Sequence, residues 1–162
     1  MASAGASIHP RSSILHSQSS LGLVEHSAGG WRWRVTPESR ELLFGPEGIR
    51  LQEWLATGEA VVIKHGPHRQ VYRVTLPGLS FYLKHNRVRD FRTWVRQLVR
   101  PSKAVMEFKR ALAVAARGVP TVAPIGFGEW SEGWKPGDSF LLTRCLDATE
   151  PLNTFEIGRA HV

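Results

Sequence analysis

Three short segments in the middle of the chain are rich in β-branched and aromatic side chains, which is typical of strands. They comprise residues 60–64, 70–76 and 79–84. The sequence His-Gly-Pro-His lies between the first two segments, and Pro-Gly lies between the second and the third. Because both sequences favour tight turns, the pattern predicts an antiparallel three-stranded meander.

Two amphipathic helices are predicted to follow the meander. Between residues 87 and 100, apolar side chains recur at helical spacing with five arginines among them, which indicates a basic amphipathic helix. Pro101 ends this helix, and Ser102 is a favourable N-cap for the next one. The apolar stripe of the second helix runs to Gly118, a residue type that commonly ends helices.

Further segments complete an α+β pattern. Residues 122–127 and 139–143 are predicted strands, and in the N-terminal part residues 31–35 are a predicted strand and residues 49–55 a short helix. From residue 59 onward the order is three strands, two helices and two strands. This order predicts an α+β fold with a five-stranded antiparallel sheet.

Changes in composition along the chain indicate three segments. Residues 1–30 are rich in Ser, Ala, Gly and His without the long apolar run of a secretory signal, so we expect a disordered leader. Residues 31–58 form an N-terminal extension, and residues 59–155 form the main unit. No apolar run approaches the roughly 20 residues of a membrane span.

The positive charge is concentrated in one segment. The chain of 162 residues has a net charge of +7, and residues 84–117 alone hold ten basic and two acidic residues. Such a segment favours phosphate groups, nucleic acid or an anionic membrane. The single cysteine, Cys145, excludes an internal disulfide and a four-cysteine metal site.

Lys84 and Glu107 are the candidate chemical pair. Lys84 ends the third predicted strand, and Glu107 lies in the first half of the second predicted helix. In protein kinases, a strand lysine contacts the α- and β-phosphates of ATP, and a glutamate on the adjacent helix holds that lysine in place. Either residue alone is more often a solvated surface charge, so the hypothesis depends on the order of strands and helices around them.

Several segments also carry a family resemblance. They are residues 71–74, 81–84, 117–124, 125–129 and 141–144, and the helix exit Gly-Val-Pro-Thr at 118–121 is the most specific of them. Residues 71–155, about half of the chain, resemble the N-terminal lobe of the lipopolysaccharide core kinases, the Kdo/heptose kinase family with a protein-kinase-like fold.

The resemblance implies an ATP site. Lys84 would contact the phosphates, Glu107 would be its ion-pair partner, and Gly66 would lie in the turn over the phosphates. Thr143 would be the gatekeeper, and the following hinge, residues 144–148 with Arg144 and Cys145, would hold adenine through its backbone. Mg²⁺ would be the second cofactor. The turn departs from typical kinases because it has one glycine where they have three; His68 and Arg69 beside it are interpreted as solvated.

The catalytic half of such a kinase is not evident in the chain. Phosphoryl transfer in this fold needs a catalytic and a metal-binding aspartate in the second lobe. The aspartates here are Asp90, Asp138 and Asp147, and none lies in a kinase motif. We therefore expect a fragment whose C-terminal lobe and metal ligands lie outside this chain, and which is inactive alone. Residues 156–162 match an in-frame translation of a common sequencing adapter and are expected to be non-biological.

The resemblance implies an enzyme, an ATP-dependent phosphotransferase that acts on a sugar of the lipopolysaccharide inner core, heptose or Kdo. It would be cytoplasmic, with peripheral attachment to the inner membrane as one option. One alternative is a kinase-like nucleotide-binding module, either a pseudokinase or another protein or small-molecule kinase. A second alternative is a basic lipid- or nucleic-acid-binding module, in which nucleic acid is the less favoured partner.

The arginine-rich helix at residues 87–100 leaves two interpretations open. Phe91 and Trp94 lie on its apolar face. The helix either docks on the sheet through this face and exposes its arginines to water, or contacts phosphorylated sugar and anionic lipid at a membrane surface.

Overall fold

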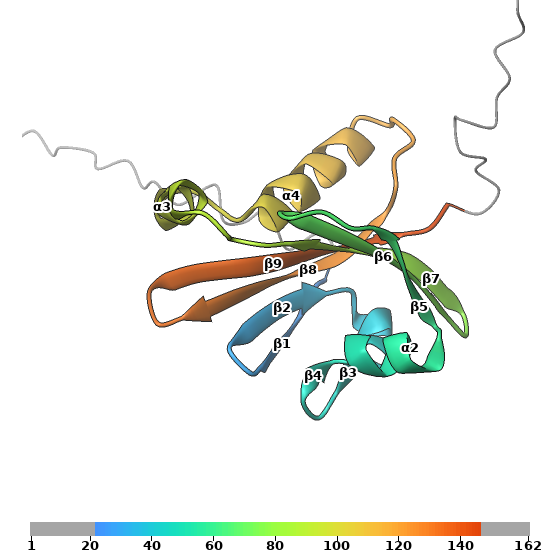
Figure 1. Ribbon diagram of the computed structural model, residues 1–162. Helices are drawn as coiled ribbons and strands as arrows, with labels where there is room; N and C mark the ends of the chain where they lie inside the picture. The colour runs from blue at the N-terminus through green and yellow to red at the C-terminus, as the bar shows by residue number, and fades with distance from the viewer. Residues whose placement is uncertain (1–21, 147–162) are drawn as a thin grey trace, which may run out of the picture.

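The computed structural model describes residues 22–146 as an antiparallel sheet with helices on both faces. Figure 1 shows α3 and α4 on one side of the sheet, and α2 with the small β3–β4 hairpin on the other. The elements follow the chain in this order: β1 Val24–Ala28, β2 Trp31–Val35, a 3-10 turn Pro37–Ser39, α1 Arg40–Leu43, β3 Phe44–Gly45, β4 Gly48–Ile49, α2 Leu51–Thr57, β5 Ala60–Lys64, β6 Arg69–Leu76, β7 Leu79–Asn86, α3 Phe91–Val99, α4 Lys103–Ala115, β8 Pro124–Glu132 and β9 Lys135–Arg144.

The main sheet has seven strands in the order β1-β2-β8-β9-β7-β6-β5, and every neighbouring pair is antiparallel. The α+β class is confirmed. The expected number of five strands is wrong, because the hairpin β1–β2 extends the sheet beyond β8. The predicted meander corresponds to β5, β6 and β7, which lie together at one end of the strand order.

The N-terminal boundaries also need correction. Strand β1, Val24–Ala28, falls within the expected leader, and it pairs in register with β2. The extension at 31–58 contributes β2 to the main sheet, so it shares one sheet with the main unit. Residues 1–21 and the adapter-like residues 156–162 lie outside the described residues.

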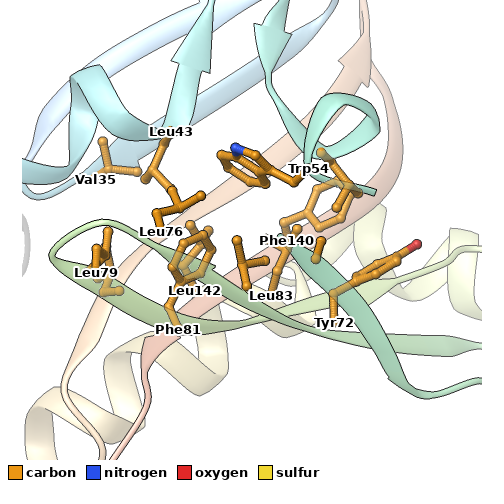
Figure 2. Packing of buried hydrophobic residues seen from close by; sticks show 14 of the residues in the cluster. Val35, Leu43, Trp54, Tyr72, Leu76, Leu79, Phe81, Leu83, Phe140 and Leu142 are labelled. Carbon is orange, nitrogen blue, oxygen red and sulfur yellow. The ribbon is translucent and has the colours of Figure 1, made fainter. Parts of the chain in front are cut away.

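The larger core lies on the α2 side of the sheet. Trp54 of α2 packs edge-on against Phe81 of β7, and the two ring centroids are 5.8 Å apart. Leu83 and Leu142 are fully buried beside them. Figure 2 shows Phe81, Leu83 and Leu142 on the sheet facing Trp54 of α2 and Leu43. The alternation of side chains along β7 therefore places its large apolar residues on this face.

A smaller core holds α4 on the opposite face. Phe108 of α4 packs against Phe127 of β8, with ring centroids 5.0 Å apart, and Leu141 of β9 belongs to the same cluster. The predicted N-cap is confirmed, since Ser102 Oγ accepts a hydrogen bond from the Val105 N–H at 3.3 Å. Helix α4 is thus fixed at its start and along one stripe.

Helix α3 is docked differently from α4. It is shorter than the predicted segment because Asp90 caps it, accepting a hydrogen bond from the Thr93 N–H at 2.6 Å. None of its residues is buried, and Phe91 and Val99 are 75% and 81% exposed. The interpretation in which α3 docks on the sheet therefore holds only in part: Trp94 is partly buried and packs against Trp134 of the β8–β9 turn, while the rest of the apolar face is exposed.

Candidate functional site

Lys84 lies on the face of β7 that is covered by α4. It pairs in register with Val71 of β6 and with Leu141 of β9, which belongs to the α4 core. Residues two apart in a strand share a face, so Tyr82 lies on the same side. Thr143 is the register partner of Tyr82 and shares that face. The structure thus brings Lys84 and Thr143 to one surface with two apolar or aromatic neighbours.

The ammonium of Lys84 is partly desolvated. Burial lowers the pKa of Lys84 below the ordinary value of 10.5; the negative charge of Glu107 acts to raise it, and the positive charge of Arg69 acts to lower it. The net direction is down, so the nearby carboxylate does not fully compensate the loss of water. An ammonium in this condition favours an additional anionic partner.

Glu107 is held by a different cation from the expected one. Its Oε2 accepts from Arg69 Nη2 at 3.0 Å, and the two side chains are 25% and 31% exposed. Lys84 interacts with Glu107 electrostatically but lies outside the 4.0 Å of a direct ion pair. Arg69, which the sequence placed in a solvated turn, is the first residue of β6. The structure therefore shows a group of three charges where the sequence predicted two.

The turn with Gly66 joins β5 to β6 next to this group. A Cβ at position 66 would lie 3.2 Å from the carbonyl oxygen of Arg69, a tight contact that favours glycine. Lys64 pairs with Val71, and Val71 pairs with Lys84, so the turn lies just beyond the level of Lys84. The turn is therefore close enough in the sheet register to contribute to a ligand site at Lys84.

Thr143, Arg144 and Cys145 lie at the end of β9. Thr143 and Cys145 are buried, and Arg144 is exposed. The Arg144 N–H donates to the Ala123 carbonyl and the Cys145 N–H donates to the Ser80 carbonyl, both at 2.9 Å. These two N–H groups are therefore engaged within the protein. An adenine contact at this segment would use carbonyl oxygens or later residues, and residues 147 and 148 of the predicted hinge lie outside the described part.

The aspartates of the described chain have structural partners. Asp90 caps α3. Asp138 accepts from the His85 ring and from the Val88 N–H, both at 2.8 Å. Burial acts to raise the pKa of Asp138, but these hydrogen bonds and nearby positive charge outweigh it, so the pKa is lowered. Within residues 22–146, no group of three or more His, Cys, Asp or Glu side chains is placed to hold a metal ion.

Helix length bears on membrane attachment. Within the described part of the chain, no helix combines the length and the apolar character needed to cross a bilayer.

Sequence reasoning missed Arg69, Val71 and Tyr82 as members of this surface. The period of two along β7 places Tyr82 with Lys84, so that signal was present in the sequence. The register between β6 and β7, which adds Val71 and Arg69, comes from the structure. No protein-family model, no curated protein and no solved structure matches the chain.

Proposed function

We propose that the chain is the nucleotide-binding part of an ATP-dependent kinase that phosphorylates a sugar of the lipopolysaccharide inner core. The observation that carries the nucleotide site is Lys84, a partly desolvated cation on the third meander strand that faces the helix bearing Glu107. The sugar acceptor rests on the family resemblance alone.

Different side chains on this surface are proposed to contact different parts of ATP. The Lys84 ammonium contacts the phosphates, and the low solvation of that ammonium strengthens the contact. The partly exposed Tyr82 offers an aromatic surface beside it, and the buried side chains of Val71 and Thr143 lie on the neighbouring strands as the register partners of Lys84 and Tyr82, respectively. ATP supplies the transferable phosphoryl group when it is bound.

Glu107 sets the position of the positive charges. It is paired with Arg69 at 3.0 Å, and its negative charge partly opposes the lowering of the Lys84 pKa by burial. The ion pair restricts the long Arg69 side chain, and the charge of Glu107 attracts the Lys84 ammonium towards α4, so less entropy is lost when a phosphate binds. Glu107 is therefore a positioning residue for Lys84 and Arg69.

The chain alone is expected to bind nucleotide without transferring phosphate. Asp90 and Asp138 are committed to local hydrogen bonds, and neither lies on the surface with Lys84. In-line transfer needs a catalytic aspartate and a metal-binding aspartate, which we assign, with the Mg²⁺ ligands, to a second lobe.

Nucleotide binding by the 162-residue chain tests this proposal. Isothermal titration with ATP should show binding that Lys84→Ala weakens at least about tenfold, since a charge-assisted contact with phosphate is lost. Lys135→Ala is the matched control, because Lys135 is an exposed lysine at the start of β9, six residues along the strand from Leu141, the β9 partner of Lys84. Equal loss in both variants, or no loss in Lys84→Ala, would refute the assignment of Lys84. Phosphorylation of lipopolysaccharide by this chain would refute the two-lobe division.

A second proposal concerns attachment to an anionic membrane through α3. The helix exposes Phe91 and Val99 and carries arginines close to them. Apolar side chains with flanking cations are typical of helices that lie at the headgroup level of anionic bilayers. Such attachment would hold a cytoplasmic protein at the inner membrane, where a glycolipid acceptor is accessible.

Co-sedimentation with phosphatidylglycerol vesicles over a salt series tests this attachment. The double variant Arg89→Gln/Arg92→Gln should lose roughly 2 kcal/mol of binding, about thirtyfold, at an estimated 1 kcal/mol for each arginine. The control Arg73→Gln/Arg117→Gln removes the same charge away from α3 and should bind nearly as the parent does. Binding that is insensitive to salt, or tighter binding to duplex DNA at equal salt, would refute the membrane assignment.

A further inference from the structure

A cavity of about 530 Å³ lies between α3, α4 and the end of β7, with His68 of the turn before β6 at its edge. Five arginine and lysine side chains line it, contributed by the end of β7, by α3 and by the start and middle of α4. They are Arg87, Arg96, Arg100, Lys103 and Arg110. Lys84 is not among the lining residues, so the cavity is a different place from the proposed nucleotide surface.

The two acidic side chains in the lining offset only part of this positive charge, and the charge of Arg96 acts on Asp90 without a direct ion pair. Asp90 accepts from the Thr93 N–H at 2.6 Å and from the Thr93 hydroxyl at 2.9 Å, as the cap of α3. Glu107 is paired with Arg69. On the cationic side, Arg87 donates to the neutral amide of Gln70. The other four cations make no ion pair within 4.0 Å in the part of the chain that the structure describes.

Asn86 gives an independent indication of a ligand. It is 6% exposed and lines the cavity, and neither its amide nitrogen nor its amide oxygen has a hydrogen-bond partner in the described part of the protein. Buried polar groups are nearly always hydrogen-bonded, and an unpaired one is costly. The amide N–H of Asn86 suits an anionic oxygen, and its carbonyl suits a hydroxyl or a protonated phosphate oxygen.

The start of α4 adds to the preference for an anion. Pro101 and Lys103 line the cavity at the N-terminal end of this 13-residue helix. Helix N-termini carry partial positive charge and favour phosphate groups. Guanidinium groups from two facing helices can approach a phosphate from two sides, which is the arrangement that arginine serves best.

We infer that the cavity between α3 and α4 binds a ligand bearing a phosphate or diphosphate group, with Asn86 donating to it and Arg96 and Arg110 facing it from the two helices. Because Glu107 also lines this cavity, α4 borders both this site and the surface with Lys84. The inference does not depend on the nucleotide site.

Titration of the 162-residue chain with inorganic pyrophosphate tests the inference. The double variant Arg96→Gln/Arg110→Gln removes one cation from each helix and should weaken binding at least about tenfold. The matched control is Arg92→Gln/Lys109→Gln, which takes one exposed cation from each of the same helices outside the cavity lining. The control should bind within about twofold of the parent. Equal weakening in both variants would overturn the inference, because binding would then follow net charge.

Two further variants distinguish binding in this cavity from binding elsewhere on the protein. Asn86→Leu removes both unpaired polar groups at similar volume, so it should keep or raise the melting temperature without ligand while weakening pyrophosphate binding several-fold. Undiminished binding by this variant would overturn the role of Asn86. Because the Lys84 surface is itself proposed to bind phosphate, Lys84→Ala is measured together with Arg96→Gln/Arg110→Gln. Pyrophosphate binding that remains in Lys84→Ala and is lost when the two arginines are also replaced belongs to the cavity. Loss in Lys84→Ala with retention in Arg96→Gln/Arg110→Gln would move the anion to the nucleotide surface and overturn the inference.

A parallel experiment with lipid vesicles distinguishes a soluble phosphate ligand from a lipid headgroup. Phosphatidic acid vesicles present the same chemistry on a lipid headgroup. Pyrophosphate binding that depends on the cavity indicates a soluble phosphate ligand, and vesicle binding alone that depends on Arg96 and Arg110 indicates a headgroup. If neither probe binds, or neither depends on these arginines, the inference fails.

Discussion

Removing Arg69 gives the sharpest test of the charge group on β6, β7 and α4. Arg69→Met keeps a long apolar stem and deletes the guanidinium that pairs with Glu107 at 3.0 Å. The change also removes a cost, because Arg69 Nε is buried without a hydrogen-bond partner in the described residues. After the change, Lys84 is the cation that already interacts with Glu107 electrostatically. We therefore expect Lys84 to replace Arg69 as the partner of Glu107.

The stability change follows from this replacement. Exposed ion pairs contribute about 0.2–1 kcal/mol, whereas breaking a buried pair costs about 3–5 kcal/mol. The side chains of Arg69 and Glu107 are 31% and 25% exposed, which places their pair between these limits. Glu107→Gln leaves two cations without a counter-charge and should cost about 1–2 kcal/mol, and Arg69→Met should cost less than about 1 kcal/mol. Chemical denaturation measures both values, and a larger loss for Arg69→Met would contradict the replacement.

The ionisation of Lys84 gives a second readout with an opposite sign in the two variants. Arg69→Met should raise the pKa of Lys84, because Arg69 acts to lower it, and Glu107→Gln should lower it further, because Glu107 acts to raise it. NMR titration of the lysine ammonium group measures the pKa. Arg73→Met is the matched control, since Arg73 is exposed four residues further along the same face of β6. A shift of Lys84 in the same direction in both test variants would refute the reasoning.

Three further predictions concern stability. Lys84→Met should raise the free energy of unfolding at pH 7, because it removes a partly desolvated charge. The parent should become more stable as the pH rises towards 10.5, the ordinary pKa of lysine, because in this range the unfolded chain keeps a proton that the folded chain has lost. Lys84→Met should not show this rise. Asp138→Ala should lower the free energy of unfolding by about 1–3 kcal/mol, since it removes the acceptor of two hydrogen bonds at 2.8 Å. Because the pKa of Asp138 is lowered in the folded protein, its stabilising contribution is complete at neutral pH and should be lost below about pH 3.8 in an acid titration. Gly128→Ala should cost about 1–3 kcal/mol in thermal unfolding, because its Cβ would overlap the buried ring of Trp33, whereas Gly45→Ala, which meets only the Arg50 side chain at 3.5 Å, should cost less.

The part of the fold that local sequence determines was predictable. Strands β5, β6 and β7 follow the β-branched segments and the turns between them, and Gly78 has the positive φ of +80° that its Pro-Gly turn needs. Strand β1 was not predictable, because Val-Glu-His-Ser-Ala has one β-branched residue and its pairing is supplied by β2. A strand stabilised mainly by its neighbour gives little local signal.

The candidate site shows the same division. Lys84 and Glu107 could be selected by residue type and by their elements, but which cation pairs with Glu107 depends on distances across the sheet. Those distances follow from the packing of Phe108 on Phe127, which fixes α4, and from the register that puts Arg69 at the start of β6. The spacing of residues along the chain contains neither quantity. The exposure of Phe91 could not be predicted from the sequence either. An amphipathic pattern predicts a helix with an apolar face, but it does not show which element, if any, covers that face.

The distribution of charge over the two faces of the sheet links the proposed sites. The α2 face carries the large apolar core, while Lys84, Arg69 and the cations of α4 lie on or beside the other face. Separating burial from charge in this way lets the fold be stable without neutralising its cations. The partly desolvated Lys84 and the buried, unpaired Asn86 then raise the free energy of the empty protein. Binding an anion at either place removes part of that cost, so phosphate-bearing ligands should stabilise the chain against unfolding in proportion to their occupancy.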